Sequence, residues 1–192
     1  MFFRHKMYRQ LMTRLGRPAG PAQETTAVVL TAALQLLLAE GAAALTPQRL
    51  HTATGVSRST IYRHWPTPGD VLAALIDVAP LGPAERTGDL AHDLHAEVDL
   101  LCNRLRDRPV AAMLQALVAA AATDLRHRYV GDLLAPFHDV LTAAGIGPAD
   151  RDDAVAAIVS PLLVDALLLD RPTARTRAHR TVDDVAARLA RA

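Results

Sequence analysis

Alanine and leucine dominate this chain of 192 residues, whereas aromatic residues make up only 4% of it. Ala and Leu are among the best helix formers, and strands favour aromatic and β-branched residues. Hydrophobic residues reach 51% and charged residues 21%, which is enough apolar material for a buried core. The composition therefore predicts an all-α protein, built as one large domain or two small ones.

Glycine and proline residues divide the chain into segments whose apolar residues recur at helical spacing. A further helix opens after Thr67, with Pro68 at its first position and Asp70 in its first turn. Residues 80–88 contain two prolines and two glycines, so we expect a joint there. The other predicted helices cover residues 22–40, 47–54, 58–65, 89–107, 110–123, 125–144, 149–169 and 182–191.

The helices predicted at 47–54 and 58–65 are joined by a short turn that contains Gly55. Such a pair is typical of a helix-turn-helix, whose second helix enters the major groove of DNA. At about 100° per residue, Ile61 and Trp65 share one face of the second helix and anchor it. A short helix packed for stability alone is the alternative. The exposed side carries groups that can bind bases and phosphates, namely Ser59, Thr60, Tyr62 and Arg63.

Basic residues gather toward the N-terminal end of the chain. Residues 1–66 hold eight basic and two acidic residues, which gives a net charge of +6. Residues 67–192 carry −5, so the whole chain is nearly neutral at +1. This asymmetry favours an N-terminal module that binds a polyanion such as DNA.

The sequence reads Ala33-Leu34-Gln35-Leu36-Leu37, then Leu45-Thr46, then TGVSRSTIYRHWP over residues 54–66. Together these stretches resemble the DNA-binding domain of TetR-family transcriptional regulators, over roughly residues 22–78. The resemblance implies a homodimer, usually a repressor, that leaves its palindromic operator when a small molecule enters the regulatory domain. It also implies DNA contacts at Arg17, Thr46, Gln48, Ser57, Arg58, Ser59, Tyr62 and His64.

Three positions depart from the family's pattern. Leu37 stands where a Phe is usual, a change that we expect the core to accommodate by repacking. Pro68 stands where the family commonly has a lysine, so a cation and an N–H are missing from an expected phosphate contact. His51 stands where a small residue is usual, either as a surface substitution or as an added DNA contact.

We expect three regions: a basic N-terminal arm at 1–20, a helix-turn-helix domain at 21–80, and a helical regulatory and dimerisation domain at 81–192. In the last region, small alanines beside a few bulky residues predict an internal apolar pocket. Its ligand should be uncharged or cationic and largely hydrophobic. A tightly packed bundle without a cavity is the alternative. The expected lining residues are His95, Cys102, Met113, Gln115, Leu117, Tyr129 and Phe137.

Residues 154–169 are apolar nearly all round, and such a helix must be covered on more than one side. We therefore expect a two-fold homodimer built mainly from the helices at 149–169 and 182–191.

Other classes of protein are less well supported by the sequence. His92 and His95, with Asp93, Glu97, Asp99 and Cys102 nearby, could supply half a metal site, but their spacing also fits solvated or pocket-lining side chains. We predict no metal and no cofactor. The chain has no glycine-rich phosphate loop, no zinc-hydrolase motif and no nucleophile elbow, so we predict that it is not an enzyme.

The single cysteine, Cys102, excludes an intramolecular disulfide and fits a reducing cytoplasm. No apolar run approaches the ~20 residues that cross a bilayer, so we expect a cytoplasmic protein without a membrane partner. The alternative function is that of an architectural helix-turn-helix DNA-binding protein that responds to no ligand.

Overall fold

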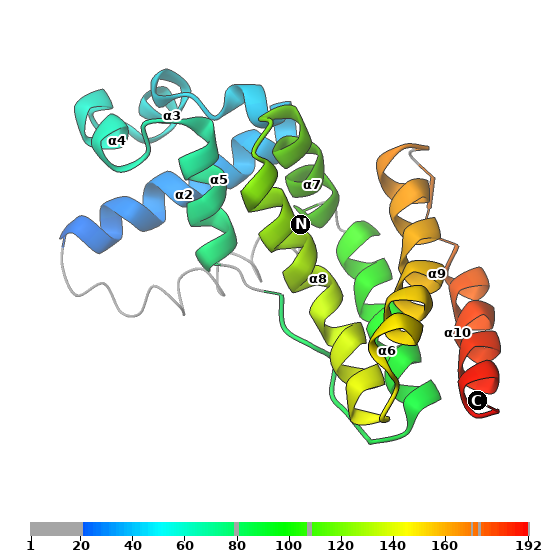
Figure 1. Cartoon of the computed structure of the whole chain (residues 1–192). Helices are drawn as coiled ribbons and strands as arrows, with labels where there is room; N and C mark the ends of the chain where they lie inside the picture. Colours follow the sequence, from blue (N-terminus) through cyan, green and yellow to red (C-terminus); the bar gives the residue numbers. More distant parts are fainter. Residues whose placement is uncertain (1–20, 79–80, 107–108, 170, 173, 192) are drawn as a thin grey trace. The chain divides into compact units, whose positions relative to one another are not determined.

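The computed structural model describes residues 21–78, 81–106, 109–169, 171–172 and 174–191. All regular structure in these residues is helical, which confirms the all-α class (Figure 1). The expected arm at 1–20, with Arg17, lies outside the described residues. The helices are α2 (Pro21–Glu40), the 3-10 helix η1 (Ala42–Ala44), α3 (Pro47–Thr54), α4 (Arg58–His64), α5 (Pro68–Val78), α6 (Leu90–Arg106), α7 (Pro109–Ala119), α8 (Thr123–Ala143), α9 (Pro148–Leu167) and α10 (Arg175–Leu189).

The chain forms two compact units. The first comprises the described part of Met1–Pro80 together with Ala112–Tyr129, and the second that of Leu81–Ala111 together with Val130–Ala192. Most of α7 and the start of α8, which we expected in the regulatory region, thus belong to the first unit.

In the first unit, α2 packs against α3 and α5, and α3 packs against α4. The buried side of α2 is a stripe at helical spacing that includes Leu30, Ala33 and Leu37. Leu50 of α3 and Ile61 of α4 are fully buried. The two short helices therefore stand on an apolar core that neither could form alone.

In the second unit, α6, α9 and α10 pack against one another (Figure 1). The last helix begins at Arg175 and not near 182, so the predicted start was wrong. Its first turns are polar, and their side chains are held by α6 and α9: Arg175 binds Asn103 and Arg177 binds Asp165. Apolar periodicity alone could not show this part of the helix.

Two buried carboxylates of α6 bind the backbone of residues 84–88, within the expected joint. Asp93 accepts hydrogen bonds from the N–H groups of Thr87 (2.8 Å) and Gly88 (3.0 Å), and the bond from Thr87 contributes most to a lowered pKa of Asp93. Glu97 accepts a bond from the N–H of Ala84 at 2.9 Å, yet burial raises the pKa of its carboxyl. This part of the chain is therefore fixed to α6.

Candidate nucleic-acid interface

The first helix of the expected helix-turn-helix is bounded by local signals in the sequence. Thr46 caps α3 by accepting a hydrogen bond from the N–H of Arg49 at 3.2 Å, and Pro47 occupies the first helical position. Gly55 ends the helix in the left-handed region, with φ +74° and ψ −6°. Glycine adopts that conformation without a steric cost, so the chain turns sharply toward α4.

His51 holds the turn between α3 and α4. Its Nδ1 lies 2.8 Å from the carbonyl oxygen of Val56, and only a protonated Nδ1 can donate to that acceptor. Thr54 supports the same turn, because its hydroxyl accepts a bond from the N–H of Val56 at 3.2 Å. The half-buried His51 is therefore more than a surface substitution. It is a link within the turn.

The second helix, α4, is capped by Ser57, whose Oγ accepts a bond from the N–H of Thr60 at 3.2 Å. The same Oγ lies 2.9 Å from the Oγ of Ser59 and 2.8 Å from the Oγ1 of Thr60. Ile61 and Trp65 are buried, as predicted. The helix thus has a fixed start and a fixed inner face.

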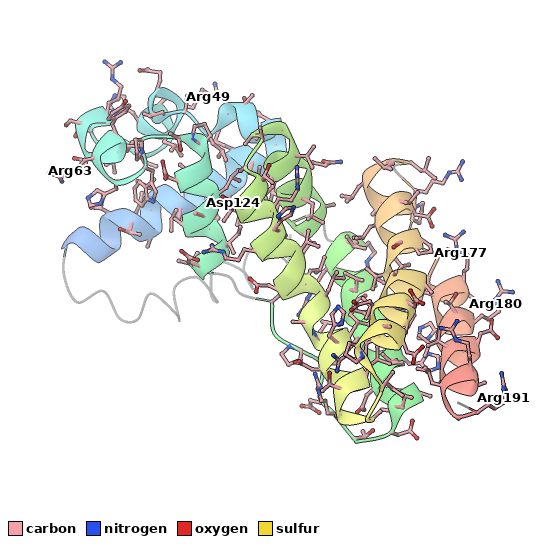
Figure 2. The ribbon with its side chains drawn as sticks, viewed as in Figure 1. Arg49, Arg63, Asp124, Arg177, Arg180 and Arg191 are labelled. Atoms are coloured by element: carbon pink, nitrogen blue, oxygen red, sulfur yellow. The ribbon has the colours of Figure 1, made fainter. Side chains whose placement is uncertain are left out.

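The outer face of α4 carries polar side chains. Tyr62 is 62% exposed, Arg63 and His64 are exposed, and Thr60 is half-buried. Arg63 projects outward from the helix (Figure 2). A shallow groove of about 490 Å³ runs along this face, and it is lined by Pro47, Arg58, Ser59, Tyr62 and Arg63. A guanidinium, a phenol and a hydroxyl thus meet at a surface open to a large partner.

Side chains of the two helices also bind one another. Arg58 donates from Nη1 to the Oε1 of Gln48 at 2.9 Å, so two predicted DNA contacts are joined. This leaves the amide N–H groups of Gln48 as donors for a base or a phosphate. Arg49, the next residue of α3, forms an ion pair with Glu40 at the end of α2. Neither pair was predicted from the sequence, because each joins residues of different helices, nine or ten positions apart.

The start of α5 shows a second reason, besides Pro68, why the phosphate contact expected there is weakened. Thr67 donates its N–H to the Oδ2 of Asp70 at 2.9 Å, and the N–H of Asp70 returns to the Oγ1 of Thr67 at 3.2 Å. This reciprocal cap uses donors that a phosphate would need and places a carboxylate beside them. The structure therefore offers little at this point to an anion.

The residues expected to line a ligand pocket are divided between the two units. Met113, Leu117 and Tyr129 are buried in the first unit, and Cys102 and Phe137 are buried in the second. Gln115 is exposed, because α7 turns Met113 and Leu117 inward and Gln115 falls on its other side. His95 is bonded to α10. Neither polar group therefore takes the expected inward role.

The metal site considered for α6 is not assembled. Asp93 and Glu97 bind residues 84–88, whereas His95 bonds to α10 and Cys102 lies in the core. Across the described parts of the chain, no group of three or more His, Cys, Asp or Glu side chains is arranged to hold a metal ion.

Residues 29–75, which run from α2 into α5, match the family model described as "Bacterial regulatory proteins, tetR family". This match falls on the helix-turn-helix described above. This part of the chain therefore carries the N-terminal DNA-binding domain that the TetR family of regulators shares.

Curated relatives resemble the chain over most of its length. Uncharacterized HTH-type transcriptional regulators of Mycobacterium bovis and Mycobacterium tuberculosis are 27% identical to it over 190 residues, which is 88% of this chain and 90% of each relative. In the described residues, no helix is both long and apolar enough to cross a membrane.

Two solved structures share the fold. A TetR transcriptional regulator from Agrobacterium tumefaciens superposes with a TM-score of 0.68 at 23% identity, over 84% of this chain and 92% of that one. A TetR family transcription regulator, SCO0332, gives a TM-score of 0.60 at 27% identity, over 84% of this chain and 96% of its own. The shared architecture therefore extends beyond the DNA-binding helices.

Proposed function

We propose that this TetR-family regulator is a homodimeric repressor that binds a palindromic operator and is released by a small, largely hydrophobic molecule. The observation that carries the proposal is the outer face of α4, where Tyr62 and Arg63 are exposed beside the groove while Ile61 and Trp65 hold the helix in the core. Arg63 is the best candidate to read a guanine, because its guanidinium can bond O6 and N7 together.

The surrounding residues have different roles in this proposal. Thr60 is half-buried near the cap and contributes a hydroxyl at the edge of the contact. Arg17 would reach the DNA from the arm. The remaining phosphate or base contacts are assigned to Thr46, Gln48, Ser57, Arg58, Ser59, Tyr62 and His64.

The dimer is supported by the open face of α9. The helix buries Val155, Ile158 and Leu162, but Ala157, Ser160 and Val164 follow one another at helical spacing on its exposed side. Val164 is 42% exposed and Leu168, just past the helix, is 76% exposed. A second copy would cover this stripe and set the two DNA-binding helix pairs on successive major grooves, about 34–36 Å apart.

The effector is assigned to the apolar interior of the first unit, near Met113, Leu117 and Tyr129. Its binding would favour the state that holds DNA less tightly. A thermal-shift screen of uncharged and cationic apolar compounds tests this part, because a ligand of the folded state raises the melting temperature by mass action. The protein would act in the cytoplasm and catalyse no reaction.

The main experiment measures operator affinity by fluorescence anisotropy, with genomic fragments selected by the purified protein. Arg63→Ala and Tyr62→Ala should each weaken binding by about 1–3 kcal/mol, and wild-type affinity should fall steeply with salt. Arg180→Ala is the matched control, since Arg180 is an exposed arginine of α10 far along the sequence from α4 (Figure 2). Wild-type affinity in both α4 variants would show that α4 does not read the operator.

A further inference from the structure

Four side chains form a continuous row between α6 and α10. Asp183 Oδ1 lies 2.9 Å from His95 Nε2, and His179 Nε2 lies 2.9 Å from Asp99 Oδ1. Between them, the Nδ1 atoms of His95 and His179 are in hydrogen-bond contact. The ring centroids are 4.6 Å apart and the interplanar angle is 25°, so the two rings meet nearly edge to edge. The groups therefore follow one another in the order carboxylate, imidazole, imidazole, carboxylate.

The number of protons in this row can be counted. Each of its three contacts needs one hydrogen, and an ionised carboxylate supplies none. A neutral imidazole carries one N–H, so two neutral histidines supply two protons for three contacts. If both Nε2–H groups donate to the aspartates, two bare Nδ1 lone pairs face each other. One contact is then repulsive unless a further cation lies between the rings.

We infer that His95 and His179 form a binding site for one extra proton, held between their Nδ1 atoms. The four groups of the row then carry a charge of −1: two aspartates and one shared positive charge. Arg175 completes the balance, because its Nε lies 3.2 Å from Asp99 Oδ1 and its Nη2 donates to Asn103 at 2.7 Å. The site is neutral as a whole and half-buried, since each histidine side chain is 28% exposed.

The charged groups around the site belong to three helices. Asp99 comes from α6, whereas Asp183 and Arg175 come from α10. From α9, Asp165 is paired with Arg177 of α10 at 2.6 Å and adds no net charge. The positive charge of the extra proton is therefore balanced by two carboxylates. These carry one negative charge in excess of it, and Arg175 offsets that charge.

The bound proton stabilises the contact between α10 and α6. The apolar part of this contact is small, because α10 buries only Ala178, Val182 and Val185 among the residues described. Loss of the proton would turn one of three hydrogen bonds into a repulsion between lone pairs. A second added proton would place two cations in direct contact. Docking of α10 is therefore strongest when the pair holds one extra proton.

This proton count predicts a bell-shaped pH dependence. The docked pair holds one extra proton, whereas two separated histidines hold two in acid and none in base. Docking should therefore strengthen with pH on the acid side and weaken on the basic side, by at most about tenfold per pH unit. A single histidine–aspartate pair would give a change in only one direction. The inference does not depend on DNA binding.

The first test compares urea unfolding of the wild type with His179→Gln between pH 5 and 9. The glutamine can donate to Asp99 without titrating, so the stability difference between the two proteins should peak near pH ~6.5 and fall on both sides. His127→Gln is the control, because His127 is exposed on α8. A difference that is flat or changes in one direction only would overturn the inference.

The second test counts the protons directly and needs no unfolding. In wild type labelled with ¹⁵N-histidine, ring shifts at pH 7 should show three protonated nitrogens among the four of His95 and His179, with His95→Gln and His179→Gln giving the assignment. Two protonated nitrogens would overturn the inference. So would a spectrum that depends on zinc and is altered by a chelator, because the bridging cation would then be a metal ion.

Discussion

His51 links α3 to α4 through its bond to the Val56 carbonyl, so its loss should affect both stability and DNA binding. We expect His51→Ala to lower the free energy of unfolding by about 0.5–1.5 kcal/mol, the usual net value of one hydrogen bond. Operator affinity should fall as well, because Arg58 and Ser59 follow the turn. Thr52→Ala is the control, since the Thr52 hydroxyl bonds only within α3, to the Gln48 carbonyl. Equal effects of both substitutions would contradict this role.

Glu97 carries a cost at neutral pH, because burial raises its pKa above the ordinary value of 4.5. A raised pKa in the folded state favours the protonated form of Glu97. The contribution of this form to stability is therefore present in acid and is lost as the pH rises through the folded-state pKa. Glu97→Gln should therefore be more stable than wild type at pH 7 and no more stable well below pH 4.5. Denaturant unfolding at several pH values measures this. Glu85→Gln, at an exposed position, should show no such change.

Asp93, four residues before Glu97, has the opposite dependence. Backbone N–H donors lower its folded pKa below 3.8, so its contribution is present above that pH and is lost as the pH falls through the lowered value. The two carboxylates bind the same backbone segment, but acid removes the stabilisation from ionised Asp93 and relieves the burial of ionised Glu97.

The turn between α3 and α4 depends on a single glycine. Gly55 has φ +74°, and a Cβ added there would meet nothing within 4 Å, so the cost of a side chain is conformational and not steric crowding. Gly55→Ala should destabilise by about 1–2 kcal/mol. Gly131 lies inside α8 and also has nothing within 4 Å, so Gly131→Ala should stabilise by about 0.5–1 kcal/mol. Chemical unfolding of both variants checks the opposite signs.

Helix α10 shows how an element can be held by polar contacts. Its first turns are polar and bind Asn103, Asp165 and Asp99, while its buried stripe is only Ala178, Val182 and Val185. An expectation based on apolar periodicity finds the second half of such a helix and misses the first.

The proposed dimer would cover the open stripe of α9, so a charge placed there should separate the two copies. An unpaired charge at a buried interface costs about 3 kcal/mol or more, and Val164→Glu should raise the dimer dissociation constant at least about a hundredfold. Sedimentation velocity measures the change, and circular dichroism checks that the helices remain. Val118→Glu is the control, since Val118 is an exposed valine of α7, 60% accessible. A wild type that sediments as a monomer at micromolar concentration would exclude this dimer.

The helix-turn-helix was predictable because short-range signals define it. Thr46 and Arg49 are three residues apart, as are Ser57 and Thr60, and Gly55 ends α3 by its own backbone preference. The face of α4 follows from the helical period, so the exposure of Tyr62 and the burial of Ile61 needed no tertiary information. The all-α class follows from composition for the same reason, since helix propensity is local.

Other features depend on how helices pack and have no local signal. Arg58 meets Gln48 across a turn, and His51 bonds to the carbonyl oxygen of Val56. His95 and His179 are 84 residues apart, and their contact exists only because α10 lies along α6. A sequence can show that each helix has a buried side, but the partner on that side is selected by the packing of the whole unit.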